Sequence, residues 1–547
     1  MQVSSGDTSV ATSEKLPSNE QYAREPESQL DPEPKVNNRT ITGFKWVLVV
    51  CGVLSSTFLF SLDMSIVADV QPKIVGTFGE IEKLPWLSVA FALGTAATSL
   101  IWASVYTFFD GKWNYLIALF LFEVGSAICG AANMMDVLIF GRALAGVGGA
   151  GLYVGVLTLL STLTNATERP LYLASIGLLW GAGSVLGPVI GGAFADSPAT
   201  WRWSFYINLV VAAVFAPVYL FILPSTNPRP DMTFMQKATK MDYVGAILFM
   251  TAFCCGITGL SMGGLLFPWD SATTVVLLVI SFVTFIAFGI QQAWSIFTTP
   301  EQRLFPIHYF RTKTLALIFF LSCAGAPPII VPVYFLSLFF QLTKGDTAMD
   351  AAVKLLPFIF MSVLFSLLNG GIMGKEGHYA PWYLLASPLI ITGAALMYTV
   401  DEHSSNSEVY GYSALLGIGA GCLIQVGFIV AQAIVPRSEM SLSVAFINLS
   451  QMTGMVVGLT VANVIFLNLA QTYIQNVLPN ADPDQIKSAI SGTGSAFIGS
   501  LTVEDQARVL HAITDAISKP YLFLAVVAAI QFILSLFLKW ERVFLEM

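Results

Sequence analysis

The sequence predicts an all-α polytopic membrane protein in which almost every residue beyond position 44 lies in a membrane-spanning helix or in a connection between two of them. Three observations predict this class. Of the 547 residues, 55% are hydrophobic and 11% are charged, whereas a soluble protein carries about 25% charged residues. The mean hydropathy is +0.72. Apolar runs of about 20 residues, the length of a helix that crosses the hydrocarbon core, recur along the chain.

Residues 1–44 have a different composition. They are rich in Ser, Glu, Pro and Asn and contain few large apolar side chains, which predicts a disordered tail. The segment has no apolar core of the kind found in a cleaved signal peptide. We therefore expect the first span to act as the signal anchor.

Fourteen apolar windows are long enough to cross the bilayer. Alternating strands of about ten residues, as in an outer-membrane barrel, do not fit the pattern. The windows are 46–68, 86–107, 114–133, 137–161, 171–195, 202–223, 242–262, 272–293, 314–340, 351–372, 382–400, 409–434, 442–467 and 520–539.

The distribution of basic residues predicts the orientation. An even number of spans places both termini on the same side of the membrane. If that side is the cytoplasm, 17 of the 26 Lys and Arg residues lie on the inner side and nine on the outer side. Cytoplasmic loops are enriched in Lys and Arg, so we expect both termini to be cytoplasmic.

Two connections are long. Residues 225–241 form a polar, proline-containing cytoplasmic linker. Residues 473–519 form a long outer loop in which polar and apolar residues alternate at helical spacing, as in VEDQARVLHAITDAI. Such a stretch lies on the bilayer surface or caps the outer mouth, or it is simply a mobile polar loop.

The sequence carries no signature of an enzyme or of a cofactor site. It contains no phosphate-binding P-loop, no nucleophile elbow and no H-E-x-x-H pair. The six cysteines lie in apolar runs and the four histidines in loops, so we expect neither a metal nor a disulfide framework. There is no basic stripe for nucleic acid. Transport by this chain would then be driven by an ion gradient.

The fourth span reads GRALAGVGGAG and includes Arg142. Its G-x-G-x-x-G from Gly146 to Gly151 is not a dinucleotide fingerprint, because it lies within one apolar span instead of a strand–turn–helix unit. A guanidinium in the membrane costs roughly 2.5–3.5 kcal/mol on insertion scales. Arg142 therefore faces a cavity or a carboxylate, or else snorkels to the outer interface.

Two acids lie within predicted spans, Asp63 in the first and Glu123 in the third. An ionisable residue in a span is expensive and is by default a functional candidate. We interpret both as proton-coupling residues together with Arg142. The alternatives are a capping role near the helix end for Asp63, and a structural pair or a hydrogen-bonded core acid for Glu123.

The fifth span reads GSVLGPVIGG. Gly183, Gly187 and Gly191 recur every four residues and share one helical face, which lets a neighbouring helix approach closely. Pro188 removes a backbone donor and bends the helix. With Gly192, this pattern suits a helix that packs tightly and rocks.

Uncharged polar and aromatic residues in the spans are candidates for a substrate cavity. Amides in a span line a polar cavity or bind helices together, and aromatics line a cavity or pack. The candidates are Tyr153, Trp180, Tyr334, Gln425, Gln432, Asn448 and Gln451.

These motifs together resemble the major facilitator superfamily, in particular its fourteen-span drug:proton antiporter branch with the fungal toxin and multidrug efflux pumps. The resemblance covers residues 45–541. The segments that carry it are SLDMSIVADVQPKI, GRALAGVGGAG, GSVLGPVIGG, WRWSFYINL, VPVYFLSLFFQLTKGDTAMDAAVKLLPF and GIGAGCLIQVGFIVAQAIVP.

The sequence departs from the family pattern at several positions. Ala103 stands where a glycine usually opens the loop between spans two and three, and the basic residues of that loop are reduced to Lys112. In the sixth span, Val210 replaces a common proline, and Ala212 and Ala213 replace common glycines. These departures concern the latch of the cytoplasmic gate and not the fold.

The resemblance implies two six-helix bundles, at 45–224 and 312–547, with two inserted helices and their linkers at 225–311. It implies proton-coupled efflux of a hydrophobic or amphipathic small molecule, such as a secondary metabolite, toxin or drug, by alternating access around a midplane site. The alternatives are import, for example of an iron chelate, and a non-transporting receptor or scaffold. We expect a monomer in the plasma membrane, although a vacuolar membrane gives the same sequence signals.

Overall fold

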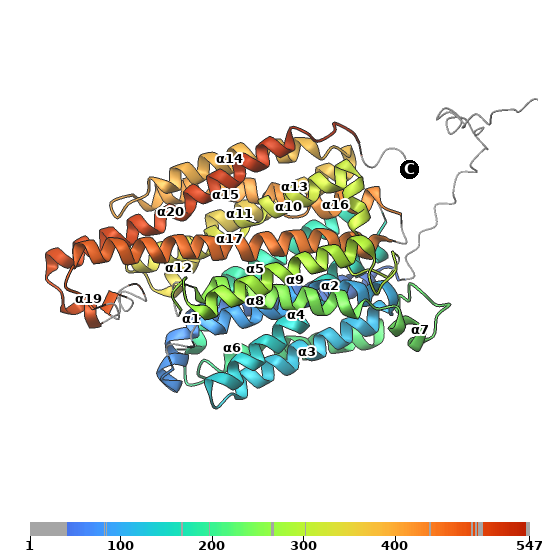
Figure 1. Ribbon diagram of the computed structural model, residues 1–547, viewed down its shortest axis with the longest axis horizontal. Helices are drawn as coiled ribbons and strands as arrows, with labels where there is room; N and C mark the ends of the chain where they lie inside the picture. Colours follow the sequence, from blue (N-terminus) through green and yellow to red (C-terminus); the bar gives the residue numbers. More distant parts are fainter. Residues whose placement is uncertain are drawn as a thin grey trace, which may run out of the picture. The chain divides into compact units, whose positions relative to one another are not determined.

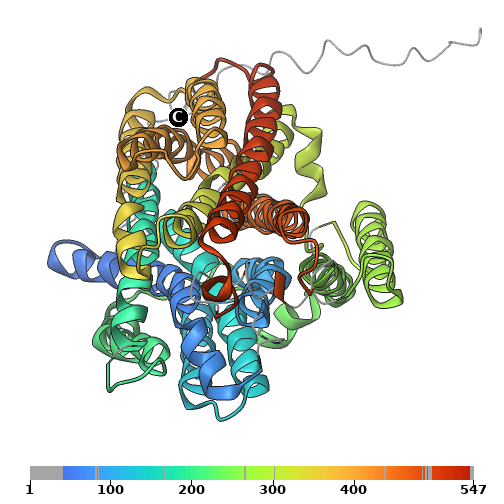
Figure 2. The same ribbon diagram turned by 90° about the vertical axis from the view of Figure 1, so that its left-hand side faces the viewer.

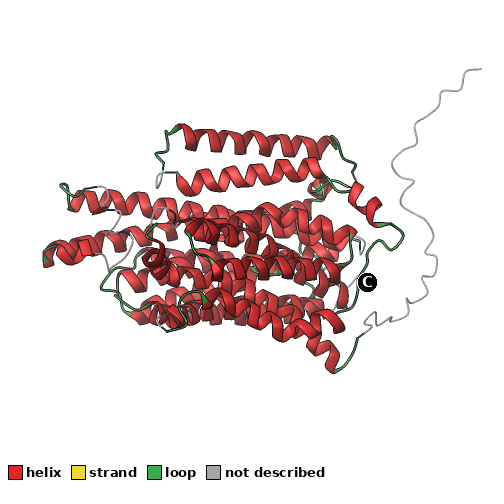
Figure 3. Ribbon diagram, turned by 90° about the horizontal axis from the view of Figure 1, so that it is seen from below, coloured by secondary structure: helices red, strands yellow, loops and turns green. Residues whose placement is uncertain are grey.

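The computed structural model describes residues 41–542, apart from 81–82, 84, 166–167, 196, 264–266, 301, 437–438, 483–484, 487–489 and 491–495. Within these residues every regular element is a helix (Figure 3), and the β-pairing consists of two isolated bridges. The predicted all-α class is confirmed. The predicted disordered tail lies, up to residue 40, outside the described residues.

Fourteen helical spans in the described residues are long and apolar enough to cross a membrane, which confirms the predicted number. The first six spans, called here the N-terminal group, are α1 (Phe44–Phe78), α2 (Pro85–Phe108), α3 (Gly111–Ala131), α4 (Met135–Leu163), α5 (Arg169–Ala195) and α6 (Trp203–Pro217), which a π-helical turn η2 (Val218–Ile222) extends.

The short helix α7 (Phe234–Thr239) precedes the seventh and eighth spans, α8 (Tyr243–Met262) and α9 (Ala272–Trp294). These two spans pack chiefly on each other and contact the remaining helices mainly through α2. Figure 2 shows them in green and yellow-green at one edge of the helices.

The last six spans are called here the C-terminal group. They are α10 (Lys313–Gly325) with α11 (Pro327–Leu342), α13 (Leu356–Glu376), α14 (Ala380–Tyr398), α15 (Asn406–Leu423) with α16 (Val426–Ile434), α17 (Met440–Val477) and α20 (Val503–Ser535). The shorter elements of this region are the 3₁₀ turn η3 (Ile307–Arg311), α12 (Ala348–Lys354) and α19 (Ala496–Ser500).

The two groups meet along two seams. In one seam α5 packs along α13, and in the other α17 packs along α2 and α4. Small residues allow the first approach, since a Cβ at Gly181 would lie 2.8 Å from the Val363 side chain and a Cβ at Gly177 would lie 3.0 Å from the Ser366 hydroxyl.

The helices run between two ends of the molecule. The end where α1 begins and α20 finishes, which also carries α7, is called here the N/C end (Figure 1). The opposite end, which carries α12 and α19, is called the loop end. These names are independent of which side of a membrane each end faces.

Two spans that were predicted to be continuous are broken. The ninth is interrupted between Gly325 and Pro327, where the consecutive prolines Pro327 and Pro328 have no backbone N–H to continue the ladder. The twelfth is interrupted between Leu423 and Val426. Breaks of this kind expose backbone carbonyls inside the helix group, and they occur in membrane proteins where backbone is buried in protein or lines a cavity.

The predicted loop 473–519 differs from the structure at both ends. Helix α17 continues to Val477, and α20 begins at Val503 and runs into the last span without interruption. Residues 503–519 are therefore part of a helix that continues into the last span, and not of a loop. The Thr502 hydroxyl caps this helix, and Glu504 and Asp505 stabilise its first turn.

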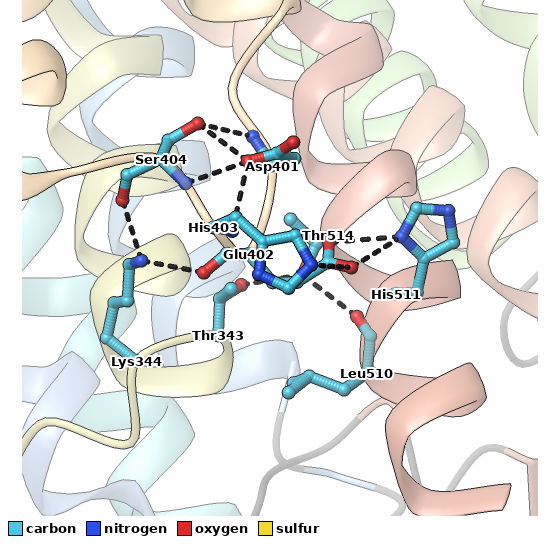
Figure 4. A network of polar contacts seen from close by, with 9 residues as sticks. All are labelled: Thr343, Lys344, Asp401, Glu402, His403, Ser404, Leu510, His511 and Thr514. Carbon is cyan, nitrogen blue, oxygen red and sulfur yellow. Dashed lines mark hydrogen bonds and ion pairs between the residues drawn. The ribbon is translucent and has the colours of Figure 1, made fainter. Parts of the chain in front are cut away.

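A polar network ties the connections together at the loop end (Figure 4). Lys344 Nζ donates to the carbonyls of Glu402 and Ser404, both at 2.8 Å. The Glu402 carboxylate contacts His511 Nδ1 of α20 at 2.9 Å. Burial alone would raise the pKa of Glu402, but the hydrogen bond with His511 and neighbouring donors outweigh burial and hold this pKa below its ordinary value.

A second network closes the N/C end of the seventh and eighth spans. The buried Asp242 carboxylate accepts hydrogen bonds from the side-chain amides of Gln291 at 3.1 Å and Gln292 at 2.7 Å, and from the backbone N–H groups of Gly245 at 2.8 Å and Leu304 at 3.3 Å. One carboxylate thus joins the start of α8, the end of α9 and the segment before η3.

This network predicts a stability effect. Replacing Asp242 with Ala removes the acceptor of several buried donors, and each donor left unsatisfied costs about 1–3 kcal/mol. We expect a lower midpoint of thermal unfolding for the purified protein, followed by tryptophan fluorescence. Asp270→Ala, at an exposed acid, is the matched control. Equal midpoints for the two variants would contradict the assigned role of Asp242.

Candidate functional site

The N-terminal group contains a buried ion pair between Asp63 of α1 and Arg142 of α4. Both side chains are at most 1% exposed. Arg142 Nε also donates to the Leu87 carbonyl at 3.0 Å, and the guanidinium carbon lies 4.4 Å from the centre of the Phe91 ring. The structure therefore places Arg142 in the interior against a carboxylate, and not at the interface, and Asp63 is its partner instead of a helix cap.

The glycines of the fourth span make this burial possible. A Cβ at Gly146 would overlap the Phe91 carbonyl of α2, and a Cβ at Gly148 would overlap the Phe122 backbone of α3. The backbone of α4 therefore approaches α2 and α3 more closely than any larger residue allows. This is the physical use of the G-x-G-x-x-G stretch.

A third residue, Asn208 of α6, completes the ion pair and was not identified from the sequence. Its Nδ2 donates to Asp63 Oδ1 at 3.0 Å and to Ser126 Oγ at 3.0 Å. Asp63 thus receives Arg142 on one oxygen and Asn208 on the other. The signal was present in the segment WRWSFYINL, where Asn208 is an amide within an apolar span.

Glu123 of α3 lies near the ion pair without joining it. Neither of its carboxylate oxygens has a hydrogen-bond partner among the described residues, and both are buried. The carboxylate is close enough to Asp63 for the two charges to interact. The structure therefore shows no partner that would offset the loss of hydration of a charged Glu123.

A small pocket of about 20 Å³ lies between the two groups of helices, lined by residues of α4, α5, α11, α17 and the break in the twelfth span. Four of the predicted cavity residues line it, namely Tyr153, Trp180, Gln425 and Gln451. The other lining residues are Ile176, Gly177, Ile329, Ile424 and Met455. These five were not identified from the sequence, because an apolar residue in a span carries no signal that separates a cavity from packing.

The amides give the pocket its polar groups. Gln451 Nε2 donates to the Ile424 carbonyl at 3.0 Å, which the break in the twelfth span leaves available, and Gln451 Oε1 accepts from the Tyr153 hydroxyl at 3.5 Å. Gln425 stands at the break itself, and neither its oxygen nor its nitrogen has a partner among the described residues. The pocket therefore presents one free amide to whatever enters it.

The other three predicted cavity residues do not line this pocket. Tyr334 is 44% exposed and packs against Phe335, while Gln432 and Asn448 are buried. Gln432 lies seven residues beyond Gln425, which corresponds to about 10 Å along a helix, so it lies closer to the N/C end. Their place in a substrate cavity stays a prediction.

Aromatic rings connect the pocket to the ion pair. Phe60 of α1 packs against Tyr153 with ring centres 5.9 Å apart and against Trp180 at 5.4 Å. On its other side, Phe60 packs against Phe91 at 5.5 Å, and Phe91 is the ring beneath Arg142. Phe60 and Phe91 thus form a line of packed rings between the pocket and the guanidinium.

The glycine face of the fifth span packs on the same helix that carries Asp63. A Cβ at Gly183 would lie 2.7 Å from Ser61, one at Gly187 would overlap the Ser65 hydroxyl, and one at Gly191 would lie 2.9 Å from Ile66. The Ser65 hydroxyl also donates to the Gly183 carbonyl at 3.1 Å. This face therefore forms the contact between α5 and α1.

The other two residues of the motif contribute less to this contact. A Cβ at Gly192 would meet no atom within 4 Å. The Pro188 side chain lies outside the described residues, so the bend predicted there stays a prediction.

The fold and site are those of a membrane transporter with a central pocket and a buried charge pair. The sequence matches the family model of the Major Facilitator Superfamily over residues 53–459. This chain belongs to that superfamily.

Three fungal proteins illustrate the similarity in sequence. The chain is 45% identical to the MFS-type transporter pgmG of Aspergillus terreus, covering 95% of this chain and 93% of that protein. It is 44% identical to the efflux pump alnA of Emericella nidulans, covering 94% of each chain. It is also 39% identical to the phomenoic acid biosynthesis cluster MFS-type transporter of Leptosphaeria maculans, covering 93% of this chain and 84% of that protein.

A solved structure supports the fold. The human organic anion transporter MFSD10 (TETRAN) aligns with 89% of this chain and 100% of its own, with a TM-score of 0.55 and 11% sequence identity. At this identity the likeness concerns the fold alone. The family and the similar sequences are transporters, and the protein is placed among them.

The contact between α5 and α1 predicts a transport defect. In Gly187→Ala the added methyl group would meet the Ser65 hydroxyl and, at 2.9 Å, the Ile66 backbone nitrogen, so the helices must separate. We expect normal membrane insertion but strongly reduced transport, measured in vesicles and normalised to the amount of protein.

The matched control is Gly289→Ala, where a Cβ meets no atom within 4 Å. Gly→Ala in an open helix position favours the helix by roughly 1 kcal/mol, so this control should transport normally. Equal transport by the two variants would show that the close approach of α5 and α1 is not required.

Proposed function

We propose that this protein exports a neutral, apolar or amphipathic small molecule in exchange for protons. The observation that carries this proposal is the separation of two sites, an uncharged pocket between the helix groups and a charged site within the N-terminal group, joined by Phe60 and Phe91. The proposed direction of transport, out of the cell, is supported by relatives that are named efflux pumps.

The pocket indicates the chemistry of the cargo. Aromatic, aliphatic and amide side chains line it, and none of its lining residues is charged. A charged cargo would lose its hydration there without gaining a counter-charge. An apolar molecule with a carbonyl or hydroxyl group would instead satisfy the free amide of Gln425.

The charged site supplies the proposed coupling. A carboxylate beside a guanidinium favours its charged form, and a buried carboxylate without such a partner favours its neutral form. Cargo that displaces Tyr153 and Phe60 would move Phe91 and the Arg142 guanidinium above it, and so change the balance of charge between Asp63 and Glu123. Each elementary charge moved through 100 mV is worth about 2.3 kcal/mol, which is sufficient to drive accumulation.

The orientation follows from the charge bias of the loops. We propose that the N/C end is cytoplasmic and that the chain acts as a monomer in the plasma membrane. In this orientation residues 478–502, between α17 and α20, lie outside the cell.

Epitope tags test this orientation. We expect a tag at residue 2 to bind antibody in permeabilised cells but not in intact cells, and a tag at residue 490 to bind antibody in both. Labelling of the first tag in intact cells would reverse the assignment of the two ends.

Coupling is tested with inside-out vesicles from a host that lacks its own drug exporters. The probe is radiolabelled cycloheximide, which is neutral and amphipathic, and the vesicles carry an acidic lumen. Asp63→Asn and Glu123→Gln should each lose uphill accumulation while exchange of labelled for unlabelled probe continues, because exchange needs no net proton movement.

Asp270→Asn, which alters an exposed acid, is the matched control and should behave as the parent does. If both single variants and the double variant still accumulate the probe, these carboxylates do not couple transport. If a protonophore leaves accumulation by the parent unchanged, exchange with protons itself is excluded.

A further inference from the structure

A second buried polar cluster lies in the N-terminal group, closer to the N/C end than the ion pair. It consists of four hydroxyl groups, those of Ser55 and Ser56 of α1, Tyr115 of α3 and Tyr219 of η2. Ser55 Oγ and Tyr219 Oη are 2.7 Å apart, and Ser56 is hydrogen-bonded to Tyr115. All four side chains are buried, and none of them lines the pocket between the groups.

This hydroxyl cluster shares its helices with the charged site. Tyr115 precedes Glu123 by eight residues on α3, and Ser56 precedes Asp63 by seven residues on α1, so about 10–12 Å along the helices separate the two sites. The side chain of a helical residue leans toward the N-terminus of its helix, which directs Glu123 toward the cluster because α3 begins at the N/C end.

The electrostatic neighbours of Glu123 also place it between the hydroxyl cluster and the ion pair. The Glu123 carboxylate lies within electrostatic range of both Asp63 and the Tyr219 hydroxyl. Beyond Tyr219, the half-exposed Lys112 donates to the Leu220 carbonyl at 2.7 Å and marks the N/C end of the row. The order along the helices, from the N/C end inward, is thus Lys112, the hydroxyl cluster, and then Glu123 and the ion pair.

The hydrogen bonds in the cluster are reversible in direction. Ser55 Oγ lies 2.7 Å from the Gly52 carbonyl and Tyr219 Oη lies 3.2 Å from the same oxygen, so either hydroxyl can donate there while it accepts from the other. The Ser56 and Tyr115 hydroxyls can likewise exchange the roles of donor and acceptor. A proton relay needs this property, because each hydroxyl must receive one proton and release another.

Packing alone does not require the four hydroxyls. When both partners of a buried hydrogen bond are replaced by apolar groups of similar shape, stability changes little, so Phe at each tyrosine together with Ala at its serine partner would preserve most of the packing. Tyr106 provides a contrast in the same group of helices. Its buried hydroxyl donates to the Gly151 carbonyl at 3.1 Å and joins α2 to α4.

We propose that the hydroxyl cluster of Ser55, Ser56, Tyr115 and Tyr219 is the route by which protons pass between Glu123 and the N/C end. Water in the remaining gap carries the proton between the cluster and the carboxylate. In each step one O–H bond forms and another breaks at the same oxygen, so no hydroxyl keeps a net charge. Protons and cargo then use different passages, and the proposal rests on proton exchange being the function.

The test follows protonation of Glu123 directly, without cargo. The purified full-length protein is reconstituted in lipid, the bulk pH is stepped, and the carboxyl C=O stretch is followed by time-resolved infrared difference spectroscopy. Subtraction of the Glu123→Gln spectrum assigns the band. The same step in D₂O gives the solvent isotope effect on the rate.

We expect Tyr115→Phe and Tyr219→Phe to slow protonation by roughly 100-fold, the scale on which a positioned proton-transfer group acts. Tyr106→Phe is the matched control and should keep the parent rate. A purely structural role would lower the unfolding midpoint and leave the protonation rate and its isotope effect unchanged.

A second pair of variants covers the case in which a tyrosine variant does not fold. Ser55→Ala removes a hydroxyl and should slow protonation, whereas Ser55→Thr keeps the hydroxyl and should restore the rate. Parent-like rates in all cluster variants, with a band that still responds to pH, would overturn the route and leave the proposed function intact. A parent band that never responds to pH would remove Glu123 from coupling and the route with it.

Discussion

The buried ion pair between Asp63 and Arg142 is the interaction on which the N-terminal group depends. A guanidinium within a membrane costs roughly 2.5–3.5 kcal/mol on insertion scales, and removing one partner of a buried pair typically costs 3–5 kcal/mol because the other charge remains unpaired. The two charged groups therefore need further favourable contacts that offset their loss of hydration. The Leu87 carbonyl, the Phe91 ring and the Asn208 amide supply those contacts.

Closing the pair requires close helix packing. Residues with a Cβ at Gly146 or Gly148 would push α4 away from α2 and α3, and a larger residue at Gly187 would push α5 away from α1. The two glycine motifs thus act on the same structure from different sides. One lets the arginine reach the interior, and the other holds the helix that carries its carboxylate against the wall of the pocket.

The sequence predicted the parts of this site that are expensive in a membrane. The sequence identified Asp63, Glu123 and Arg142 because a charged residue in an apolar span has a high free-energy cost and so indicates a function. The sequence could not predict that Asp63 pairs with Arg142, because 79 positions separate them along the chain and the packing of α1 against α4 brings them together. Asn208 was not identified because an uncharged amide in a span has a lower free-energy cost than a charge and is a weaker sequence signal.

The same reasoning explains the partial success with the pocket. The number of spans was predictable because an apolar run of fixed length is a strong signal, whereas the breaks in the ninth and twelfth spans were not expected. Gln425, whose side-chain amide has no partner among the described residues, stands at one of these breaks, and Gln451 uses the Ile424 carbonyl that the break makes available. The sequence signal, a polar or aromatic residue within a span, is the same for Tyr334, Gln432 and Asn448, but the fold does not place these residues in the pocket lining.

Separating the charged site from the pocket has a consequence for specificity. The lining residues differ in chemistry from the groups that would hold protons, and the packed rings of Phe60 and Phe91 lie between the two sites. A substitution in the C-terminal group, for example at Ile329 or Met455, changes the shape of the pocket without touching the ion pair. On the proposed function, relatives that share the charged site can therefore differ in cargo. The charged site of the N-terminal group would drive transport, and the pocket side chains of both groups would select what is carried.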